Sequence, residues 1–151
     1  MRPTLIAALA ALTLAWPAMA ADVPSLEERW REDPGQIFEA GDIDLADLKW
    51  VARPVVIFAN SPRDPSFVEQ MEEIRADMPR LITRDVIVIT DTNPDEPSDL
   101  RNRLRPRGFM LVLIGKDGRI ELRKPLPWTV RELSRSIDKM PMRRQEMGRD
   151  R

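Results

Sequence analysis

Residues 55–89 read VVIFANSPRDPSFVEQMEEIRADMPRLITRDVIVI, and this stretch decides the fold. It begins and ends with the apolar runs 55–59 and 86–89, which are typical of strands that are covered on both faces. Between these runs, Asp64 and Pro65 predict the start of a helix whose apolar face continues to Met78, where Pro79 ends or kinks it. Strand, helix and strand in this order predict parallel pairing through a right-handed crossover.

The second half of the chain predicts an antiparallel addition to this unit. Residues 98–104 predict a short helix capped by its first serine, and residues 109–114 predict a third apolar strand. Asp117-Gly118 predicts a hairpin turn before an edge strand at residues 120–123, and Thr129 with Glu132 forms the capping box of a last helix. The sequence therefore predicts an α/β fold in the order β-α-β-α-β-β-α, with a central mixed four-stranded sheet flanked by helices.

The chain divides into four segments by composition. Residues 1–20 have the basic start, short apolar run and small-residue ending of a signal peptide, with cleavage expected after Ala20. We therefore expect a periplasmic or secreted protein, and no apolar run is long enough for a membrane span. Residues 21–41 form a polar lead-in, residues 42–141 the folded domain, and residues 142–151 a charged tail that is expected to be frayed.

Composition excludes several kinds of chemistry. The 151 residues include neither cysteine nor histidine, which excludes thiol redox chemistry, a disulfide-linked partner and imidazole or thiolate metal ligands. With 24 basic and 25 acidic residues the chain is near neutral, which argues against nucleic acid or an anionic membrane as a partner. No cofactor is expected, and the composition favours a protein that is not an enzyme.

Two segments carry a resemblance to the thioredoxin fold. Residues 58–63 resemble the first strand and the redox loop of thioredoxin-like proteins, and residues 108–118 resemble their third strand and turn. Positions 60–65 contain no cysteine, and Met110 stands where those proteins have a cis-proline that helps to hold extended peptides. The resemblance therefore implies the fold without its usual active site.

Longer segments are similar to the bacterial family of domains of unknown function numbered 4174, which is related to peroxiredoxin-like domains of secreted animal matrix proteins. The segments that carry this resemblance are residues 47–50 (DLKW), 53–59 (RPVVIFA), 113–118 (LIGKDG) and 137–147 (IDKMPMRRQEM). The resemblance implies a small exported thioredoxin-like domain and supplies no catalytic residue.

Two basic regions are candidate anion sites. The loop of residues 60–64 follows the first strand, where helix-end donors favour anions, although Asp64 as a cap already uses those donors. Arg63, Arg105 and Arg107 are expected at the same end of the sheet, and solvated arginines are the simpler interpretation. Residues 101–107 resemble a polyanion patch in charge alone, so ion pairing with the acidic residues 91–99 is favoured.

The remaining candidates are weaker. Met142 and Met147 could bind copper(I) with Met140, although core packing explains Met140 better. The carboxylates of residues 91–99 lack the spacing of a calcium loop and are expected to be solvated. The lysines are expected to be exposed, and so unsuited to act as a base. They are Lys49, Lys116, Lys124 and Lys139.

These observations favour a non-enzymatic module that binds another envelope or secreted protein, or an extended peptide. Its expected surfaces are the loop of residues 60–64, the edge strand and the tail. The alternatives are a peroxiredoxin-like oxidoreductase descendant that works without a thiol, and a copper(I) or anion binder. The interaction candidates are Asn60, Ser61, Arg63, Asp64, Arg105, Arg107, Met110, Met142, Arg143, Arg144 and Met147.

Overall fold

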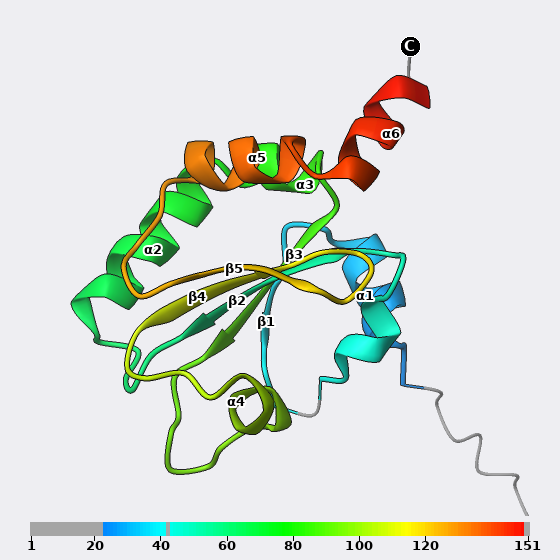
Figure 1. Ribbon diagram of the computed structural model, residues 1–151. Helices are drawn as coiled ribbons and strands as arrows, with labels where there is room; N and C mark the ends of the chain where they lie inside the picture. Colours follow the sequence, from blue (N-terminus) through cyan, green and yellow to red (C-terminus); the bar gives the residue numbers. More distant parts are fainter. Residues whose placement is uncertain (1–22, 42, 150–151) are drawn as a thin grey trace, which may run out of the picture.

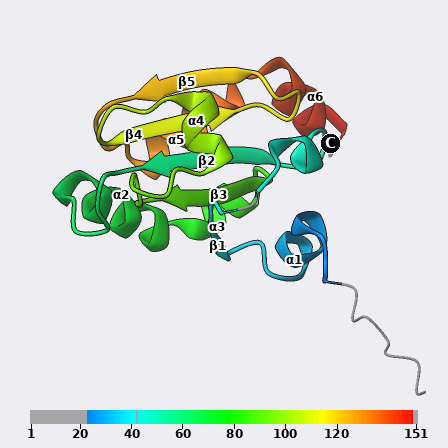
Figure 2. The same cartoon turned by 90° about the horizontal axis from the view of Figure 1, so that it is seen from below.

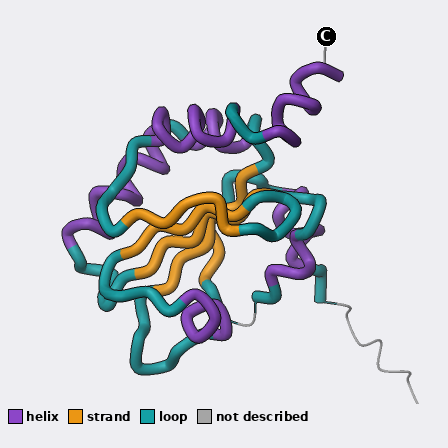
Figure 3. Tube along the Cα trace, viewed as in Figure 1, coloured by secondary structure: helices purple, strands orange, loops and turns teal. Residues whose placement is uncertain are grey.

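The computed structural model describes residues 23–41 and 43–149, so the predicted signal peptide at residues 1–20 lies outside the described residues. The described chain folds around a central sheet, whose strands are orange in Figure 3. The sheet is mixed and five-stranded, with the strand order β1-β3-β2-β4-β5. The first three strands in this order are mutually parallel, whereas β4 and β5 are antiparallel to their neighbours. The strands are β1 (Ile37–Glu39), β2 (Arg53–Phe58), β3 (Val86–Asp91), β4 (Met110–Ile114) and β5 (Ile120–Lys124).

The predicted strand-helix-strand unit is confirmed. β2 and β3 are parallel and in register from Arg53 opposite Val86 onward, and the chain between them forms α2 (Pro65–Ala76) and α3 (Met78–Ile82). The Asp64 carboxylate accepts hydrogen bonds from the backbone N–H groups of Ser66 and Phe67, as a cap does. Pro79 lies in the first turn of α3, so the helix is interrupted there because proline cannot continue the hydrogen-bond ladder.

The prediction of a four-stranded sheet is wrong by one strand. Residues 37–39, within the predicted lead-in, form β1 and pair with β3 at the far edge of the sheet. Three residues are too few to show an alternating pattern, and β1 is fixed by pairing and by burial of Phe38 and of Trp30 from α1 (Leu26–Glu32). The lead-in is therefore part of the folded core.

Helices cover both faces of the sheet (Figures 1 and 2). On one face α2, α3 and α5 (Val130–Asp138) bury residues such as Ile74, Leu81 and Leu133, and the predicted capping box of Thr129 and Glu132 is present at the start of α5. On the other face lie α1, the short 3-10 helix η1 (Leu45–Leu48) and α4 (Asp99–Leu104). This second layer is built from short pieces, and the groove described below lies in it.

The predicted hairpin between β4 and β5 is confirmed, with β5 at the edge of the sheet. Gly118 has φ +82° in the turn, a conformation that favours glycine, and its N–H donates to the Gly115 carbonyl. The ladder is irregular next to the turn: Leu113 pairs with Leu122, but Ile114 pairs with Ile120, so Glu121 is an extra residue.

The prediction of a frayed tail is wrong for the residues that the structure describes. Residues 141–149 form α6 (Pro141–Arg149), which continues beyond α5 and ends the chain away from the sheet (Figure 1). Its sequence has little apolar pattern, and the contacts that fix it are the ion pairs described next.

Candidate functional site

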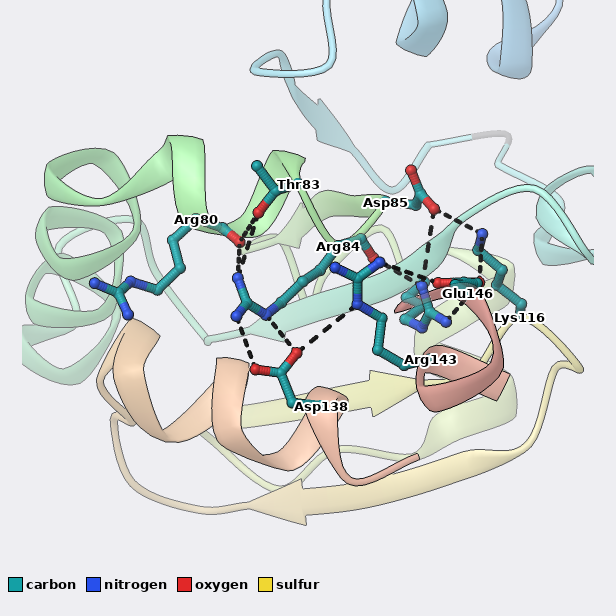
Figure 4. A network of polar contacts seen from close by, with 9 residues as sticks. Arg80, Thr83, Arg84, Asp85, Lys116, Asp138, Arg143 and Glu146 are labelled. Atoms are coloured by element: carbon teal, nitrogen blue, oxygen red, sulfur yellow. Dashed lines mark hydrogen bonds and ion pairs between the residues drawn. The ribbon is translucent and has the colours of Figure 1, made fainter. Parts of the chain in front are cut away.

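An ionic cluster lies where β2 and β3 begin (Figure 4). Arg53 is the first residue of β2, and its side chain is 1 % exposed. It donates one hydrogen bond of 2.9 Å to the Arg84 carbonyl and another of 2.9 Å to the Glu146 carboxylate of α6. A guanidinium in this position needs such partners because burial of an unpaired charge is costly.

Glu146 is the acceptor at the centre of this ionic cluster. Besides Arg53, its carboxylate oxygens lie 3.0 Å from Lys116 Nζ and 3.2 Å from the Arg143 guanidinium. Burial alone would raise the pKa of Glu146, but the hydrogen bonds and charges of Arg53 and Lys116 outweigh it and lower this pKa from 4.5 to about 2. Glu146 is therefore ionised at neutral pH and ties α6 to the sheet.

A second acid, Asp138 at the end of α5, extends the ionic cluster. Arg84 donates two hydrogen bonds of 2.9 and 2.8 Å to the two oxygens of Asp138, in the bidentate geometry that suits a guanidinium and a carboxylate. The Arg143 Nε lies 3.8 Å from the same carboxylate. The cluster thus joins α5 and α6 to the sheet, and each charge in it has an opposite charge close by.

Lys116 corrects the expectation that the lysines are exposed. Its side chain is 12 % exposed, and its Nζ lies 2.7 Å from the Asp85 carboxylate and 3.0 Å from that of Glu146. Position 116 follows an apolar strand and precedes a turn, so nothing in the local sequence shows that α6 will cover it. Both of these contacts are made within the fold, so Lys116 connects the β4–β5 turn to α6.

Asp91 corrects the expectation of a wholly solvated acidic loop. It is buried at the end of β3, where Arg101 of α4 donates to it at 2.7 Å and the Ser98 hydroxyl donates to it at 2.6 Å. Arg101 also donates to the Ala59 carbonyl at 2.8 Å. The predicted ion pairing between residues 101–107 and the acidic residues before them is therefore confirmed for this pair.

The carboxyl ends of β1 and β3 border an acidic cavity of about 470 Å³. Its lining includes Glu39, Asp91 and Glu96, but Asp91 is already neutralised by Arg101. Within residues 23–41 and 43–149, no group of three or more carboxylates is arranged to hold a metal ion. Of the three carboxylates, only Asp91 is used within the fold, whereas Glu39 and Glu96 are exposed.

A larger groove of about 580 Å³ lies between η1, α4 and the β4–β5 turn, and we call it the β4–β5 groove. Its apolar lining residues are Leu45, Ala46, Leu48, Pro54, Leu104, Ile114 and Ile120. Its charged lining residues are Lys49, Arg103, Lys116, Arg119 and Asp117, so four cations face one carboxylate. The groove is thus apolar at its base and basic at its rim, which suits an amphipathic ligand better than a small polar one.

The irregular hairpin shapes this groove. Because Glu121 is the extra residue, Ile120 pairs with Ile114 and lines the groove beside it, although it remains 45 % exposed. Bulges commonly redirect a side chain in this way. The hairpin therefore presents an apolar side chain to solvent at the edge of the sheet.

Trp50 follows the lining residue Lys49 in the sequence but is not itself among the residues that line the groove. Its side chain is 66 % exposed, its φ is +65°, and its backbone N–H donates to the Lys116 carbonyl at 2.8 Å. A left-handed conformation is costly for a residue other than glycine, and exposure of an indole ring gains nothing for the fold. Core packing therefore does not explain Trp50.

The predicted loop site lies at the other end of the sheet. Met110 pairs with Phe58 there, whereas the β4–β5 groove lies at the Pro54 and Ile114 end. Asp64 caps α2, and Ser61 is half-buried and accepts a hydrogen bond from the Arg63 N–H. The exposed members of the predicted set are Asn60, Arg63, Arg105 and Arg107. The structure places these segments at one end of the sheet without showing a ligand-binding arrangement among them.

The predicted residues of the tail separate into distinct environments. Met140 is buried against the α5 face, as core packing predicts, while Met142 and Met147 are half-buried on α6. Arg143 faces the ionic cluster with its side chain 14 % exposed, and Arg144 is exposed. The structure therefore uses Arg143 within the fold and leaves Arg144 at the surface.

Sequence reasoning did not single out the β4–β5 groove. Its residues come from three separate segments, residues 45–54, 103–104 and 114–120, and only the helix at residues 98–104 and the hairpin were predicted individually. One signal was present: residues 47–50 and 113–118 both carry the family resemblance, and they touch, since a methyl group at Gly118 would lie 3.1 Å from Lys49 Cε. Contact between these two segments in the fold explains why both of them carry the family resemblance.

The fold and its groove define a small α/β protein with a mixed five-stranded sheet and flanking helices. The chain belongs to the family described as "Domain of unknown function (DUF4174)", whose model matches residues 44–146. The matched range begins just before η1 and ends at Glu146, so it includes the groove and the ionic cluster. No curated protein matches the chain.

Proposed function

We propose that this protein is an exported, thioredoxin-like module that binds a partner protein or an extended peptide and performs no catalysis. The observation that carries the proposal is Trp50, which is 66 % exposed, is held at φ +65° and follows Lys49 of the groove lining in the sequence. Aromatic residues of this kind dominate binding energy at protein interfaces. A solvent-exposed tryptophan in a costly backbone conformation is better explained by a partner than by folding.

The order of elements supports the thioredoxin-like part of the proposal. A β-α-β unit is followed by a helix, an antiparallel hairpin and a last helix, as in that fold. The loop of residues 60–64 follows the central strand β2, where thioredoxin-like proteins have their redox motif, and it contains no cysteine. The export part rests on residues 1–20, and no helix among the described residues has the length and apolarity to cross a bilayer.

The distribution of charge supports binding over catalysis. Arg53, Lys116 and Glu146 neutralise one another, and Asp91 is paired with Arg101, so these buried groups already have partners within the protein. Catalytic acids and bases instead need a proton affinity that is poised near the working pH. The β4–β5 groove, the exposed edge of β5 and Trp50 remain available to a partner.

The proposal is tested by selecting peptides from a random display library on the purified protein and measuring their affinity by fluorescence anisotropy. Trp50→Ala and Ile120→Asp are expected to weaken the selected peptides at least tenfold. The matched controls are Leu126→Ala for Trp50→Ala and Val68→Asp for Ile120→Asp. Leu126 is 67 % exposed and Val68 is 42 % exposed, and neither residue lines the groove or adjoins a lining residue in the sequence. Failure to select any peptide, or equal loss in the controls, would contradict the proposal.

The export part has its own test. Intact mass of the protein recovered from the periplasm or medium of a bacterial expression host should correspond to a chain that begins at Ala21. Recovery of the whole chain from the cytoplasm would contradict export without affecting the binding test.

A further inference from the structure

The rim of the β4–β5 groove carries positive charge that the fold does not use. Among the described residues, Lys49 and Arg103 form no ion pair. Arg119 is 84 % exposed and reaches only Asp117, at 3.7 Å. An exposed pair of this length contributes little to stability, so the side chain of Arg119 is available to a ligand.

We propose that the β4–β5 groove binds an acidic segment of a partner protein that inserts a bulky apolar side chain between η1, α4 and Ile120. This inference rests on the proposed binding function and names the chemistry of the partner. Charge complementarity carries it, because the rim presents Lys49, Arg103 and Arg119 against Asp117 alone, with Lys116 already engaged by Asp85 and Glu146.

The base of the groove explains why the segment is apolar as well as acidic. Leu45 and Leu48 of η1, Leu104 of α4 and Ile114 of β4 surround a volume of about 580 Å³. Such a volume is within the range of pockets that enclose a ligand, and here it can take one or two large side chains. An apolar side chain placed there removes apolar surface of both the groove and the ligand from water, while the acidic groups beside it contact the basic rim.

The edge strand explains why the occupant is a polypeptide. β5 pairs with β4 on one side, and no described strand pairs with its other side. An extended segment can hydrogen-bond to that edge and direct alternate side chains toward Ile120 and the groove. Arg123 is fixed by its hydrogen bond of 2.6 Å to the Leu104 carbonyl, so the edge is held against α4 before binding. A linear polyanion would use neither the edge nor the apolar base.

The experiment compares three peptides by fluorescence anisotropy at low and physiological salt. The first is fluorescein-labelled Glu-Asp-Leu-Phe-Glu-Leu-Asp-Glu; the second has lysine for every acid, and the third has serine for every apolar residue. We expect the first peptide to bind and each of the other two to bind at least tenfold more weakly. Equal binding of the first and second peptides would overturn the proposal, because the charge of the rim would then be irrelevant.

Charge reversal locates the contact. Arg103→Glu combined with Arg119→Glu is expected to weaken the first peptide at least tenfold, and Ile120→Asp is expected to weaken it to a similar extent. The matched control is Arg131→Glu combined with Arg135→Glu, since both of these arginines are exposed on α5 and outside the groove. The control is expected to change affinity less than twofold, and circular dichroism confirms that each variant is folded.

The remaining outcomes separate this inference from the proposed function. If library-selected peptides bind through Trp50 and Ile120 regardless of their acid content, the acidic partner is wrong and the binding module stands. If heparin displaces the first peptide and Ile120→Asp leaves the peptide's affinity unchanged, the site is a polyanion site and the inference is wrong. If no peptide of any composition binds, both proposals fail.

Discussion

Arg101 and Arg103 lie two residues apart on α4 but have different environments and different roles. Arg101 is buried, donates to the Asp91 carboxylate and to the Ala59 carbonyl, and lies over the Phe58 ring at 5.5 Å. Arg103 is exposed and lines the β4–β5 groove. Positions two apart on a helix are rotated by about 200°, so one side chain faces the sheet and the other faces solvent.

The same division holds for the whole molecule. At the start of β2, Arg53 and Lys116 are almost enclosed and meet Glu146 at 2.9 and 3.0 Å. At the rim of the groove, Lys49 and Arg119 remain largely in water. Charges with short internal contacts hold the fold, and charges without them lie at the surface, where our proposal assigns them to a ligand. The composition of a basic run in the sequence does not distinguish the two groups.

The largest effect on stability is expected from Arg101→Met. This change leaves the Asp91 carboxylate buried with the Ser98 hydroxyl as its remaining side-chain donor, and removal of one partner of a buried pair typically costs about 3–5 kcal/mol. Urea denaturation should show this loss. The free energy of unfolding of Arg103→Met, on the same helix, should stay within about 0.5 kcal/mol of the wild-type value. Equal losses of stability in the two variants would show that the two arginines do not differ in their contribution to the fold.

Most of the fold could be predicted from local sequence. The apolar runs 55–59 and 86–89 gave central strands because every position is buried, and Asp64 and Thr129 gave helix starts because caps depend on immediate neighbours. The Asp117-Gly118 turn was equally local. Each of these features depends on residues within a few positions of one another.

The errors depend on long-range contacts. β1 has three residues and exists because β3 offers it a parallel partner, and α6 is fixed by contacts between Glu146 and residues up to 93 positions away. The groove likewise requires η1, α4 and the hairpin turn to meet. Hydrophobic periodicity and capping residues do not indicate which distant segments come into contact, so the candidate site could not be predicted. Lys49 and Lys116 were considered only as possible bases.

The second largest effect on stability is expected from a change in the ionic cluster. Glu146→Gln removes the negative charge that Arg53 and Lys116 share, while leaving a side chain of the same shape, and hydrogen bonds between charged groups are worth about 1.5–3 kcal/mol. We expect a loss of about 1–2 kcal/mol in urea denaturation, with faster tryptic cleavage within α6. Gln145→Ala, its exposed neighbour, is the control and should change neither measurement.

The pH dependence of stability tests whether the negative charge of Glu146 holds α6 in place. Because the folded pKa of Glu146, about 2, lies below its ordinary value of 4.5, its contribution is complete above pH 4.5 and is lost as pH falls toward 2. The difference in stability between wild type and Glu146→Gln should therefore shrink over this range. A difference that stays constant down to pH 2 would show that charge on Glu146 is not what holds α6.

The smallest effect on stability is expected from Trp50→Gly, and it bears on the groove. Glycine adopts the φ of +65° without strain, so relief of about 1–2 kcal/mol of backbone strain opposes the roughly 0.5–1 kcal/mol that glycine's extra freedom costs. Stability should be unchanged or higher by up to about 1.5 kcal/mol, whereas Lys49→Gly, at φ −59°, should lower it. Denaturation of both variants, together with peptide anisotropy, separates a structural role of Trp50 from a binding role. If our proposal is right, Trp50→Gly keeps the fold and loses the partner, because the indole ring is the group that contacts it. Substantial unfolding by Trp50→Gly would instead make Trp50 a structural residue and would remove the main support for the binding site.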